Sequence, residues 1–132
     1  MGGSSASPPP PAAAVPAPGQ VSRAPSDPPL LLFHAEEMES QVFQLECNGV
    51  QLCRREADNF VNGTKLLNLA HMTRGKRDAI LKHERVRDVV KAGTMRLKGV
   101  WIPLARALVL AQLHRLETLA YPLLESDPWA YV

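Results

Sequence analysis

Apolar residues that alternate with polar ones open the folded part of the chain and predict a β-hairpin. They stand on both sides of Asn48-Gly49, at Val42, Phe43, Leu45, Val50 and Leu52. Apolar alternation favours strands, and Asn-Gly between two alternating runs is typical of a two-residue hairpin turn. We therefore expect an N-terminal hairpin centred on this turn.

After Val61 the apolar spacing changes from two residues to three or four, which predicts helices. Asn62 is placed to cap a first helix, whose inward positions would be Leu66, Leu67, Ala70 and Met72. Thr73 and Gly75 are expected to end this helix. A second helix is expected from about Lys76 to Arg85, so the segment predicts a helix, a short turn and a helix.

A second hairpin and a third helix follow. Residues 93–99 are flanked by β-branched or aromatic residues, which predicts a hairpin with an exposed tip, here called the wing. Pro103 suits the first turn of a third helix. The buried stripe of that helix would be Leu104, Ala107, Leu108 and Ala111, widened by Leu110 and Leu113. Pro122 and Pro128 predict an irregular apolar end over residues 119–129.

Together these elements predict an α+β fold, a winged helix-turn-helix-like single domain with an N-terminal hairpin and a wing hairpin. Composition limits this domain to residues 30–132, because residues 1–29 hold nine of the twelve prolines and supply almost no core residues. We expect residues 1–29 to be a disordered tail rich in Pro, Ala and Ser. The start has no basic segment, and no apolar run reaches membrane-spanning length, so neither a signal peptide nor a membrane span is predicted.

The formal net charge of +2 hides an uneven distribution. Residues 54–98 hold twelve Lys and Arg against five Asp and Glu, whereas residues 30–53 hold no Lys or Arg. On a helical wheel the second helix turns Ile80, Leu81 and Glu84 inward. Its opposite side carries Lys76, Ala79, Lys82 and His83. A cationic second helix followed by a basic wing favours nucleic-acid binding over a merely solvated charged surface. The residues predicted to contact DNA are Arg74, Lys76, Arg77, Lys82, His83, Arg85, Arg96 and Lys98.

Neither a metal site nor a catalytic site is predicted. Cys47 and Cys53 lack a second Cys or His pair at zinc spacing, so we expect reduced, buried thiols and no disulfide. Four acid-base residues lie close in sequence, at His71, His83, Glu84 and Asp88. They form no set of nucleophile, base and orienting group, so no enzyme, cofactor or small-molecule substrate is predicted. We expect His71 to be a partly buried turn residue and Glu84 to partner an Arg.

Four motifs follow one another along the chain: NGTKLLN from Asn62, MTRGKRD from Met72, ILK with a following Glu from Ile80, and LKGVWIP from Leu97. In this order they resemble the fungal APSES domain of the KilA-N superfamily, most closely its StuA-like branch. The resemblance covers residues 41–124 and closes with YPLL. The chain departs from the family at residues 104–107, where an acidic residue is common, and this departure removes an ion pair expected near Arg106.

The resemblance implies a nuclear regulator of fungal transcription in development, morphogenesis or the cell cycle. Its partner would be double-stranded DNA, read at a short GC-containing core. The helix from Lys76 to Arg85 would enter the major groove, while Arg96 and Lys98 would approach the minor groove or its phosphates. Trp101 and its two following neighbours would belong to the core. Binding of a homodimer to a palindromic site is left open.

An alternative function comes from the same resemblance. Some members of this fold bind proteins or peptides and act as nuclear anchoring adaptors. Such a module would not need a basic helix and a basic wing, so the charge distribution favours DNA.

Overall fold

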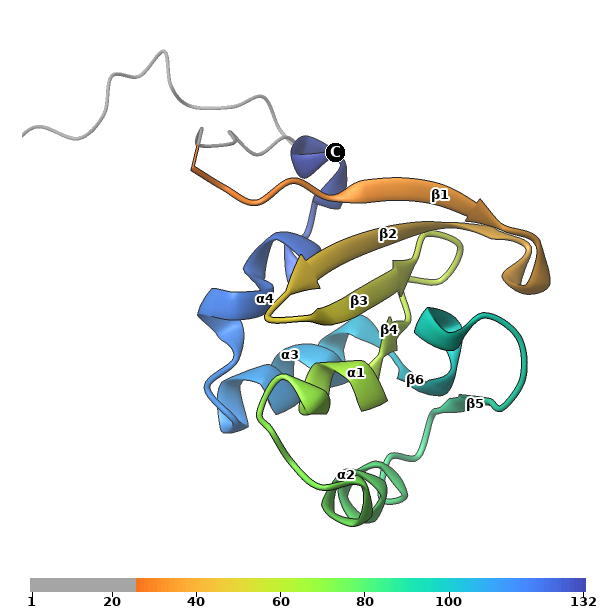
Figure 1. The fold of residues 1–132 in the computed structure, drawn as a ribbon, viewed down its shortest axis with the longest axis vertical. Helices are drawn as coiled ribbons and strands as arrows, with labels where there is room; N and C mark the ends of the chain where they lie inside the picture. The colour runs from red at the N-terminus through yellow and green to blue at the C-terminus, as the bar shows by residue number, and fades with distance from the viewer. Residues whose placement is uncertain (1–25) are drawn as a thin grey trace, which may run out of the picture.

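The computed structural model describes residues 26–132, so residues 1–25 of the tail expected over residues 1–29 lie outside the described residues. The described chain forms one antiparallel sheet in the strand order β1-β2-β3-β4-β6-β5 (Figure 1). The strands are β1 (Leu31–Ala35), β2 (Ser40–Cys47), β3 (Val50–Arg55), β4 (Val61–Asn62), β5 (Asp88–Val90) and β6 (Gly99–Ile102). The helices are α1 (Gly63–Asn68), α2 (Arg74–Leu81), α3 (Leu104–Leu113) and α4 (Glu117–Leu124). The predicted α+β class is confirmed.

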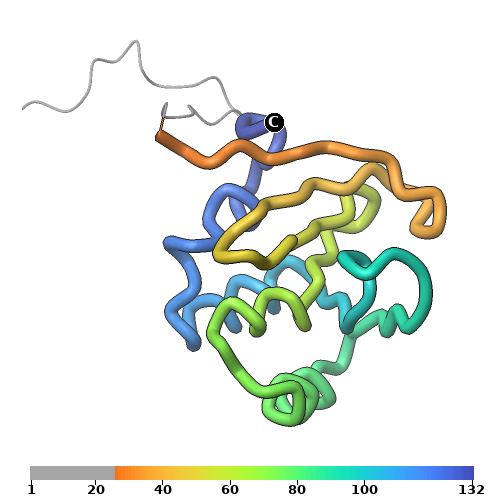
Figure 2. Tube along the Cα trace, in the orientation of Figure 1, coloured from red at the N-terminus to blue at the C-terminus, as the bar shows by residue number. Residues whose placement is uncertain are grey.

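Helices α1 and α4 pack against the sheet and α3 packs against both of them, whereas α2 projects from the body and contacts chiefly α1 (Figure 2). The hairpin of β5 and β6 lies at the side of the molecule, with the 3₁₀ helix Met95–Leu97 in its connection. This arrangement leaves α2 and the wing as the two projecting parts of the fold.

The predicted first hairpin is the pair β2 and β3. Asn48 and Gly49 join the two strands, and both have positive φ angles, of 51° and 80°. A two-residue turn with two positive φ angles matches the right-handed twist of the strands it joins. Asn and Gly are the residues that adopt this backbone at least cost, so the local sequence sets the register of the hairpin.

Strand β1 was not expected. It pairs with β2 from Leu31 opposite Gln44 to Ala35 opposite Ser40. As an edge strand it shows no clean alternation, and Leu31 is 59% exposed. Its identity therefore depends on pairing with β2, which the sequence of β1 alone does not reveal.

The two ends of the described chain meet beside β1. The N–H of Leu30 donates to the carbonyl of Tyr131 over 2.7 Å, and the hydroxyl of Tyr121 donates to Asp27. These contacts tie residues 27–30 to the C-terminal segment.

Strand β2 is buried on both faces. Phe43 and Leu45 point into the main core, which α1, α3 and α4 complete. On the other face, Val42 belongs to a smaller core around Trp101. Trp101 is fully buried, and its indole N–H donates to the carbonyl of Leu97 over 2.8 Å. The prediction that Trp101 is a core residue is confirmed.

Two expectations for the C-terminal half were wrong. In α3 the buried positions include Ala107, Leu110 and Ala111, whereas Leu108 and Leu113 are 38% and 69% exposed. These two leucines lie off the line of small and apolar residues that faces the core. The supposed irregular end is instead α4, which continues through Pro122.

A proline fits within α4 because of what surrounds it. Pro122 cannot donate to the carbonyl of Thr118, and Thr118 is an exposed residue. Arg54 satisfies carbonyl groups at the C-terminal end of this helix, because its Nη1 donates to the carbonyls of Leu123 and Glu125 over 2.8 and 2.6 Å. Burial lowers the pKa of Arg54, but a cation at a helix C-terminus is favourable.

Candidate nucleic-acid interface

The helix pair begins with two side-chain caps. Asn62 Oδ1 accepts from the backbone N–H of Lys65 over 3.2 Å, so Asn62 caps α1 as predicted. Thr73 Oγ1 accepts from the backbone N–H three residues further along over 3.3 Å. Helix α2 therefore begins at Arg74, earlier than expected, and Gly75 lies inside its first turn instead of interrupting the helix.

Helix α2 ends at Leu81, although we expected it to reach Arg85. The N–H groups of His83 and Glu84 donate to the carbonyls of Ile80 and Leu81 over 3.2 and 3.1 Å, so the last turn tightens and the helix ends. Arg87 Nη1 donates to the carbonyls of Lys82 and Glu84 over 2.8 and 2.9 Å. These bonds satisfy carbonyls in the turn that follows the helix.

An ion pair links the end of α2 to α3. Glu84 is only 5% exposed, and its two carboxylate oxygens accept from Arg106 Nε and Nη2 over 2.8 and 2.9 Å. These hydrogen bonds lower the pKa of Glu84 and raise the pKa of Arg106. The prediction that Glu84 partners an Arg is confirmed, and Arg106 has an ion pair despite the departure from the family at residues 104–107.

The inward side of α2 is held by one buried side chain and one polar contact. Leu81 is buried beside Gly63 of α1, where an added Cβ would lie 3.0 Å from Leu81 Cδ2. Arg77 Nη1 donates to Asn68 Oδ1 over 2.8 Å and to the carbonyl of Met72 over 3.1 Å. The guanidinium of Arg77, a predicted DNA contact, therefore holds the turn between the helices.

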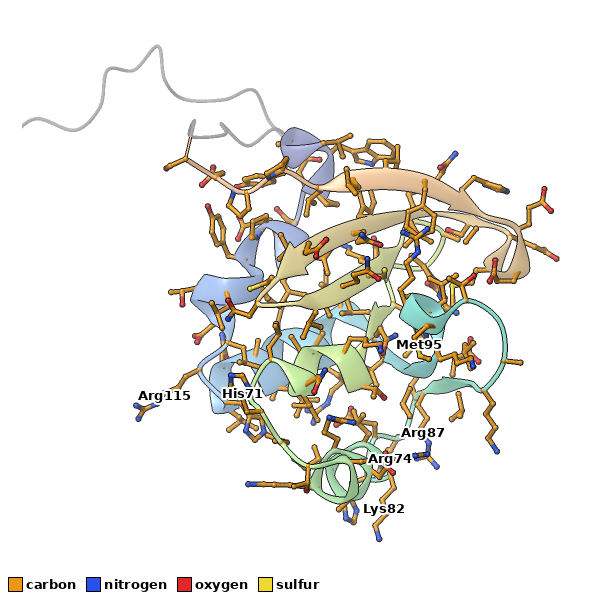
Figure 3. All side chains as sticks on the ribbon, in the orientation of Figure 1. His71, Arg74, Lys82, Arg87, Met95 and Arg115 are labelled. Atoms are coloured by element: carbon orange, nitrogen blue, oxygen red, sulfur yellow. The ribbon has the colours of Figure 1, made fainter. Side chains whose placement is uncertain are left out.

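That turn passes through His71, which has a φ of 58° (Figure 3). The expectation that His71 is partly buried is wrong, because the residue is exposed.

The outward side of α2 is cationic. The exposed residues there and in the following turn include Arg74, Lys76, Lys82, His83 and Arg85. Figure 3 shows Lys82 extending away from the body of the domain. Of this set, Arg74 is the member with a carboxylate partner among residues 26–132, at 3.8 Å from Asp78. The predicted outward placement of Lys76, Lys82 and His83 is confirmed.

The wing is fastened to the sheet near its tip. Glu37 Oε2 accepts from the hydroxyl and the N–H of Thr94 over 3.0 and 3.4 Å. These bonds lower the pKa of Glu37. Met95, in the next turn, is 68% exposed.

Arg96 is also directed toward the sheet. It donates to Gln44 Oε1 over 2.8 Å, and its guanidinium carbon lies 3.7 Å from the centroid of the Phe33 ring. Arg96 is half-buried, as is Lys98. Neither residue lies in the exposed part of the connection, residues 92–95, which Thr94 fastens to Glu37.

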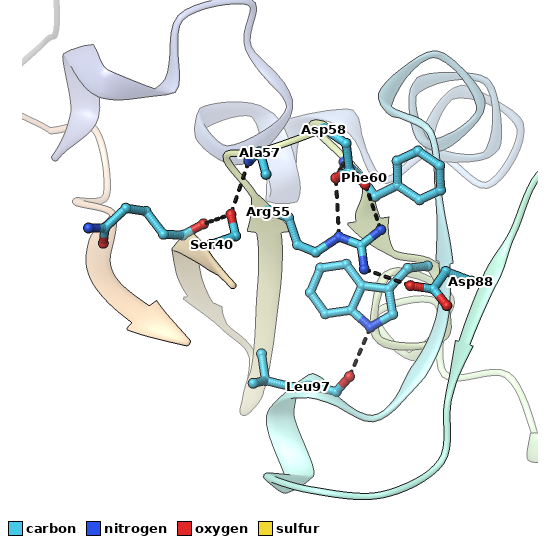
Figure 4. A network of polar contacts seen from close by, with 9 residues as sticks. Ser40, Arg55, Ala57, Asp58, Phe60, Asp88 and Leu97 are labelled. Atoms are coloured by element: carbon cyan, nitrogen blue, oxygen red, sulfur yellow. Dashed lines mark hydrogen bonds and ion pairs between the residues drawn. The ribbon is translucent and has the colours of Figure 1, made fainter. Parts of the chain in front are cut away.

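A charged network fixes the base of the wing (Figure 4). Arg55 donates to both carboxylate oxygens of Asp58 over 3.1 and 2.8 Å, and to Asp88 Oδ2 at the start of β5 over 2.8 Å. Its guanidinium lies between the rings of Phe60 and Trp101, at 4.9 and 5.1 Å from their centroids. Charge, hydrogen bonds and ring contacts together hold β5 beside β6.

A groove of about 620 Å³ separates α1 and α2 from the wing. Its cationic lining residues are Lys65, Arg74, Arg77, Lys91 and Lys98, and its acidic lining residue is Asp78. The groove therefore brings together three of the predicted contact residues. Lys76, Lys82, His83 and Arg85 are not on its lining, and Arg96 lines a smaller hollow of about 250 Å³ that also contains Lys65.

Lys65 and Lys91 also belong to this surface, although they were not among the contact residues predicted from the sequence. Lys65 stands within the NGTKLLN motif, and Lys91 directly follows β5. They lie on one groove because β4, which leads into α1, pairs with β6 of the wing. That pairing joins segments about forty residues apart, so no local pattern reveals it.

The remaining reactive residues do not form a second site in the described chain. Cys53 is buried, and desolvation raises its pKa to about 12, whereas Cys47 is half-buried. Within residues 26–132 no three His, Cys, Asp or Glu side chains are grouped to hold a metal ion. No helix in the same residues is both long and apolar enough to cross a bilayer.

Sequence comparison identifies relatives of this chain. The KilA-N domain matches residues 44–115. "Putative transcription factor PHD1" of Saccharomyces cerevisiae is 46% identical over 110 residues, which are 83% of this chain and 30% of that protein. "Enhanced filamentous growth protein 1" of Candida albicans is 52% identical over 92 residues, 70% of this chain and 17% of that protein. "Cell pattern formation-associated protein stuA" of Aspergillus flavus is 50% identical over 107 residues, 81% of this chain and 14% of that protein. The chain spans less than a third of each relative.

Two solved structures have a similar fold. A structure of the DNA complex of PCG2 superposes with a TM-score of 0.67 at 22% identity, covering 74% of this chain and 88% of that one. Mbp1 from Saccharomyces cerevisiae superposes with a TM-score of 0.63 at 26% identity, covering 70% of this chain and 98% of that one.

Proposed function

The chain belongs to the KilA-N domain family, as an APSES-type domain like that of stuA, and from this membership we propose that it binds double-stranded DNA sequence-specifically to regulate transcription. In this proposal α2 enters the major groove, and the wing approaches the minor groove or its phosphates. The DNA site has a short GC-containing core, and the protein acts in the nucleus. The domain serves a longer regulator of fungal development, morphogenesis or the cell cycle.

One observation carries the proposal: the outward side of α2 exposes Lys76, Lys82 and His83, none of which has a carboxylate partner among residues 26–132. An α-helix with its side chains is about 10–12 Å across, which suits a major groove about 12 Å wide. Because α2 projects from the body, a duplex can approach it without contact with α3 or α4 (Figure 1). The relatives named for transcription, filamentous growth and cell pattern formation support a regulatory role over catalysis.

Selection from a pool of random duplexes tests this function. We expect recovery of one enriched core, and a palindromic core would support binding by a homodimer. The affinity for the selected duplex should also fall steeply with salt. If about four to six cations meet phosphates, the slope of log affinity against log salt is about −4 to −5.

Failure to enrich any core, or a slope near zero, would contradict the proposal. The second result, together with capture of a peptide ligand, would favour the protein-binding alternative.

A further inference from the structure

The groove between the helix pair and the wing is cationic, yet little of its charge is neutralised within the domain. The ion pairs among residues 26–132 join Arg55 to Asp58 and Asp88, Arg74 to Asp78, and Arg106 to Glu84. The ammonium groups of Lys65, Lys91 and Lys98 therefore have no carboxylate partner in the described chain. Three unpaired cations on one concave surface create a positive potential that favours an anionic ligand.

The cations do not cover the whole groove. Val89, Val90 and Val100 of the two wing strands also form part of its lining, as does Gly99 at the start of β6. Val89 is 47% exposed, and it pairs with Val100 across the wing hairpin, so the two side chains give this wall an apolar surface open to solvent. The groove thus combines cationic and apolar surface. A sugar-phosphate strand of DNA is complementary to both, because its phosphates are anionic and the faces of its deoxyribose rings present carbon and hydrogen.

The two walls of the groove are held at a fixed distance. Thr64 Oγ1 accepts from the N–H of Val100 over 2.9 Å, and the side-chain amide of Asn62 donates to the carbonyl of Lys98 over 2.9 Å. At Gly99 an added Cβ would lie 2.4 Å from Asn62 Oδ1, so the close approach requires glycine. The groove is therefore preformed, and little ordering of the chain opposes binding.

We infer that this groove holds one sugar-phosphate strand of the duplex, with Lys65, Lys91 and Lys98 contacting consecutive phosphates and Val89 and Val100 packing against the sugars. This inference rests on the proposed function, and it assigns different roles to two surfaces of the domain. The outer side of α2 reads bases, whereas the groove fixes the position of the duplex without distinguishing sequences.

The hydroxyl of Thr64 adds a neutral donor to the same wall. Its oxygen already accepts from Val100, which leaves its proton available to a phosphate oxygen. Arg74 and Arg77 contribute less, because Arg74 lies near Asp78 and Arg77 is bonded to Asn68 and Met72.

The experiment compares the 132-residue chain with three single variants, Lys65→Gln, Lys91→Gln and Lys98→Gln, and with the triple variant. Affinity for the selected duplex and for a scrambled duplex is measured from 50 to 200 mM salt. Each lost phosphate contact should reduce the salt slope by about 0.9. Between 50 and 200 mM salt, the loss of affinity of each single variant should then be smaller than the loss of affinity of the parent chain by a factor of about 3.5. The ratio of the affinity for the selected duplex to that for the scrambled duplex should not change.

Matched variants separate charge at the groove from charge elsewhere. Arg115→Gln removes an exposed cation on the far side of the domain, as Figure 3 shows, and should leave the slope unchanged. Lys65→Arg keeps the charge and should restore the slope. Melting temperatures within about two degrees of the parent chain show that the glutamine variants fold, as expected for side chains without intramolecular bonds.

Neutral methylphosphonates placed one at a time in the selected duplex locate the contacts. A substitution at the phosphate that meets Lys65 should weaken binding to the parent chain and have no further effect on Lys65→Gln. If the triple variant binds DNA with the parent slope, the groove inference is wrong while the proposed function stands. If the parent chain retains no duplex even at 50 mM salt, the proposed function itself fails. If the parent chain binds polyglutamate more tightly than duplex and the triple variant loses that binding, the groove is a site for acidic protein segments and the inference is overturned.

Discussion

Gly99 sets the distance between the helix pair and the wing. Gly99 has a φ of 142°, a backbone conformation that residues other than glycine rarely adopt. The side chains of Asn62 and Thr64 occupy the space where a Cβ would stand. The contact is made by the same Asn62 that caps α1. The absence of a Cβ at Gly99 therefore lets the residue that caps α1 also pack against the wing.

We predict that Gly99→Ala lowers the free energy of unfolding by about 2 to 4 kcal/mol, from backbone strain and from displacement of Asn62. Chemical denaturation measures the change. The control is Gly75→Ala, because Gly75 lies in α2 with nothing within 4 Å of an added Cβ. That variant should be more stable than the parent by up to about 1 kcal/mol. Equal effects of the two variants would show that the close approach at Gly99 is not strained.

Glu84 gives the stability of the domain a predictable dependence on pH. Its folded pKa is lowered below the ordinary 4.5 by hydrogen bonds from Arg106. A lowered carboxyl pKa contributes stability that is present above the ordinary value and is lost as pH falls through the folded value. The contribution should therefore be complete at neutral pH and disappear below the folded pKa.

Glu84→Gln should lower the free energy of unfolding by about 1 kcal/mol at neutral pH, an amount limited by the solvent exposure of Arg106. The difference between variant and parent should shrink as the pH is lowered through 4.5 and below. Urea denaturation at several pH values measures it, with Glu117→Gln at an exposed residue as the comparison. A difference that is constant with pH would show that the ionised carboxylate is not the source of the stability.

At the scale of elements, local signals could be predicted and non-local ones could not. The hairpin at Asn48-Gly49 and the cap at Asn62 were predicted because the residues that specify them are adjacent in sequence. Strand β1 exists through its pairing with β2, and α4 tolerates Pro122 because buried neighbours hold it. These tertiary contacts outweigh the local preferences of both segments.

The candidate site divides in the same way. The outer side of α2 follows from helical periodicity, so Lys76 and Lys82 could be placed from the sequence. The groove depends on the pairing of β4 with β6, so Lys65 and Lys91 could not. Arg77 and Arg96 illustrate a further limit, because a cation gives the same sequence signal whether it serves a ligand or the fold.

We predict that helix and wing variants differ in their effect on specificity. Lys82→Ala, and to a lesser extent Lys76→Ala, should lower affinity for the selected duplex about tenfold more than for scrambled DNA, since a base contact discriminates by about 1 to 3 kcal/mol. Lys98→Ala and Arg96→Ala should weaken both duplexes alike. Titration of each variant with the two duplexes measures the ratio, and loss of discrimination in the wing variants alone would reverse the assignment.

Two controls distinguish the loss of a DNA contact from the loss of the folded structure. Trp101→Ala removes a fully buried ring and should cost about 3 to 5 kcal/mol of stability, abolishing binding indirectly. Arg96→Ala also removes contacts to Gln44 and Phe33, so its melting temperature must be measured beside its affinity.

At the scale of the whole molecule, the boundary of the folded unit can be tested by truncation. Deletion of residues 1–25 should leave the melting temperature unchanged, because their composition supplies little core. Deletion of residues 1–29 removes the partner of the Tyr121 hydroxyl and should lower the melting temperature by a few degrees. Thermal unfolding of both truncated chains measures the effect. A large loss in the shorter deletion would place part of the tail in the folded unit.

The single buried anchor of α2 bears on how such a domain can diversify. Leu81 ties the helix to the body, while the residues of its outer side take no part in the core. Substitutions on that side therefore carry little folding penalty, and after gene duplication each copy can drift toward a different DNA site one residue at a time. If the lysines of the groove hold the sugar-phosphate strand as proposed, related regulators that keep the sheet and this groove would share one docking arrangement and still control separate sets of genes.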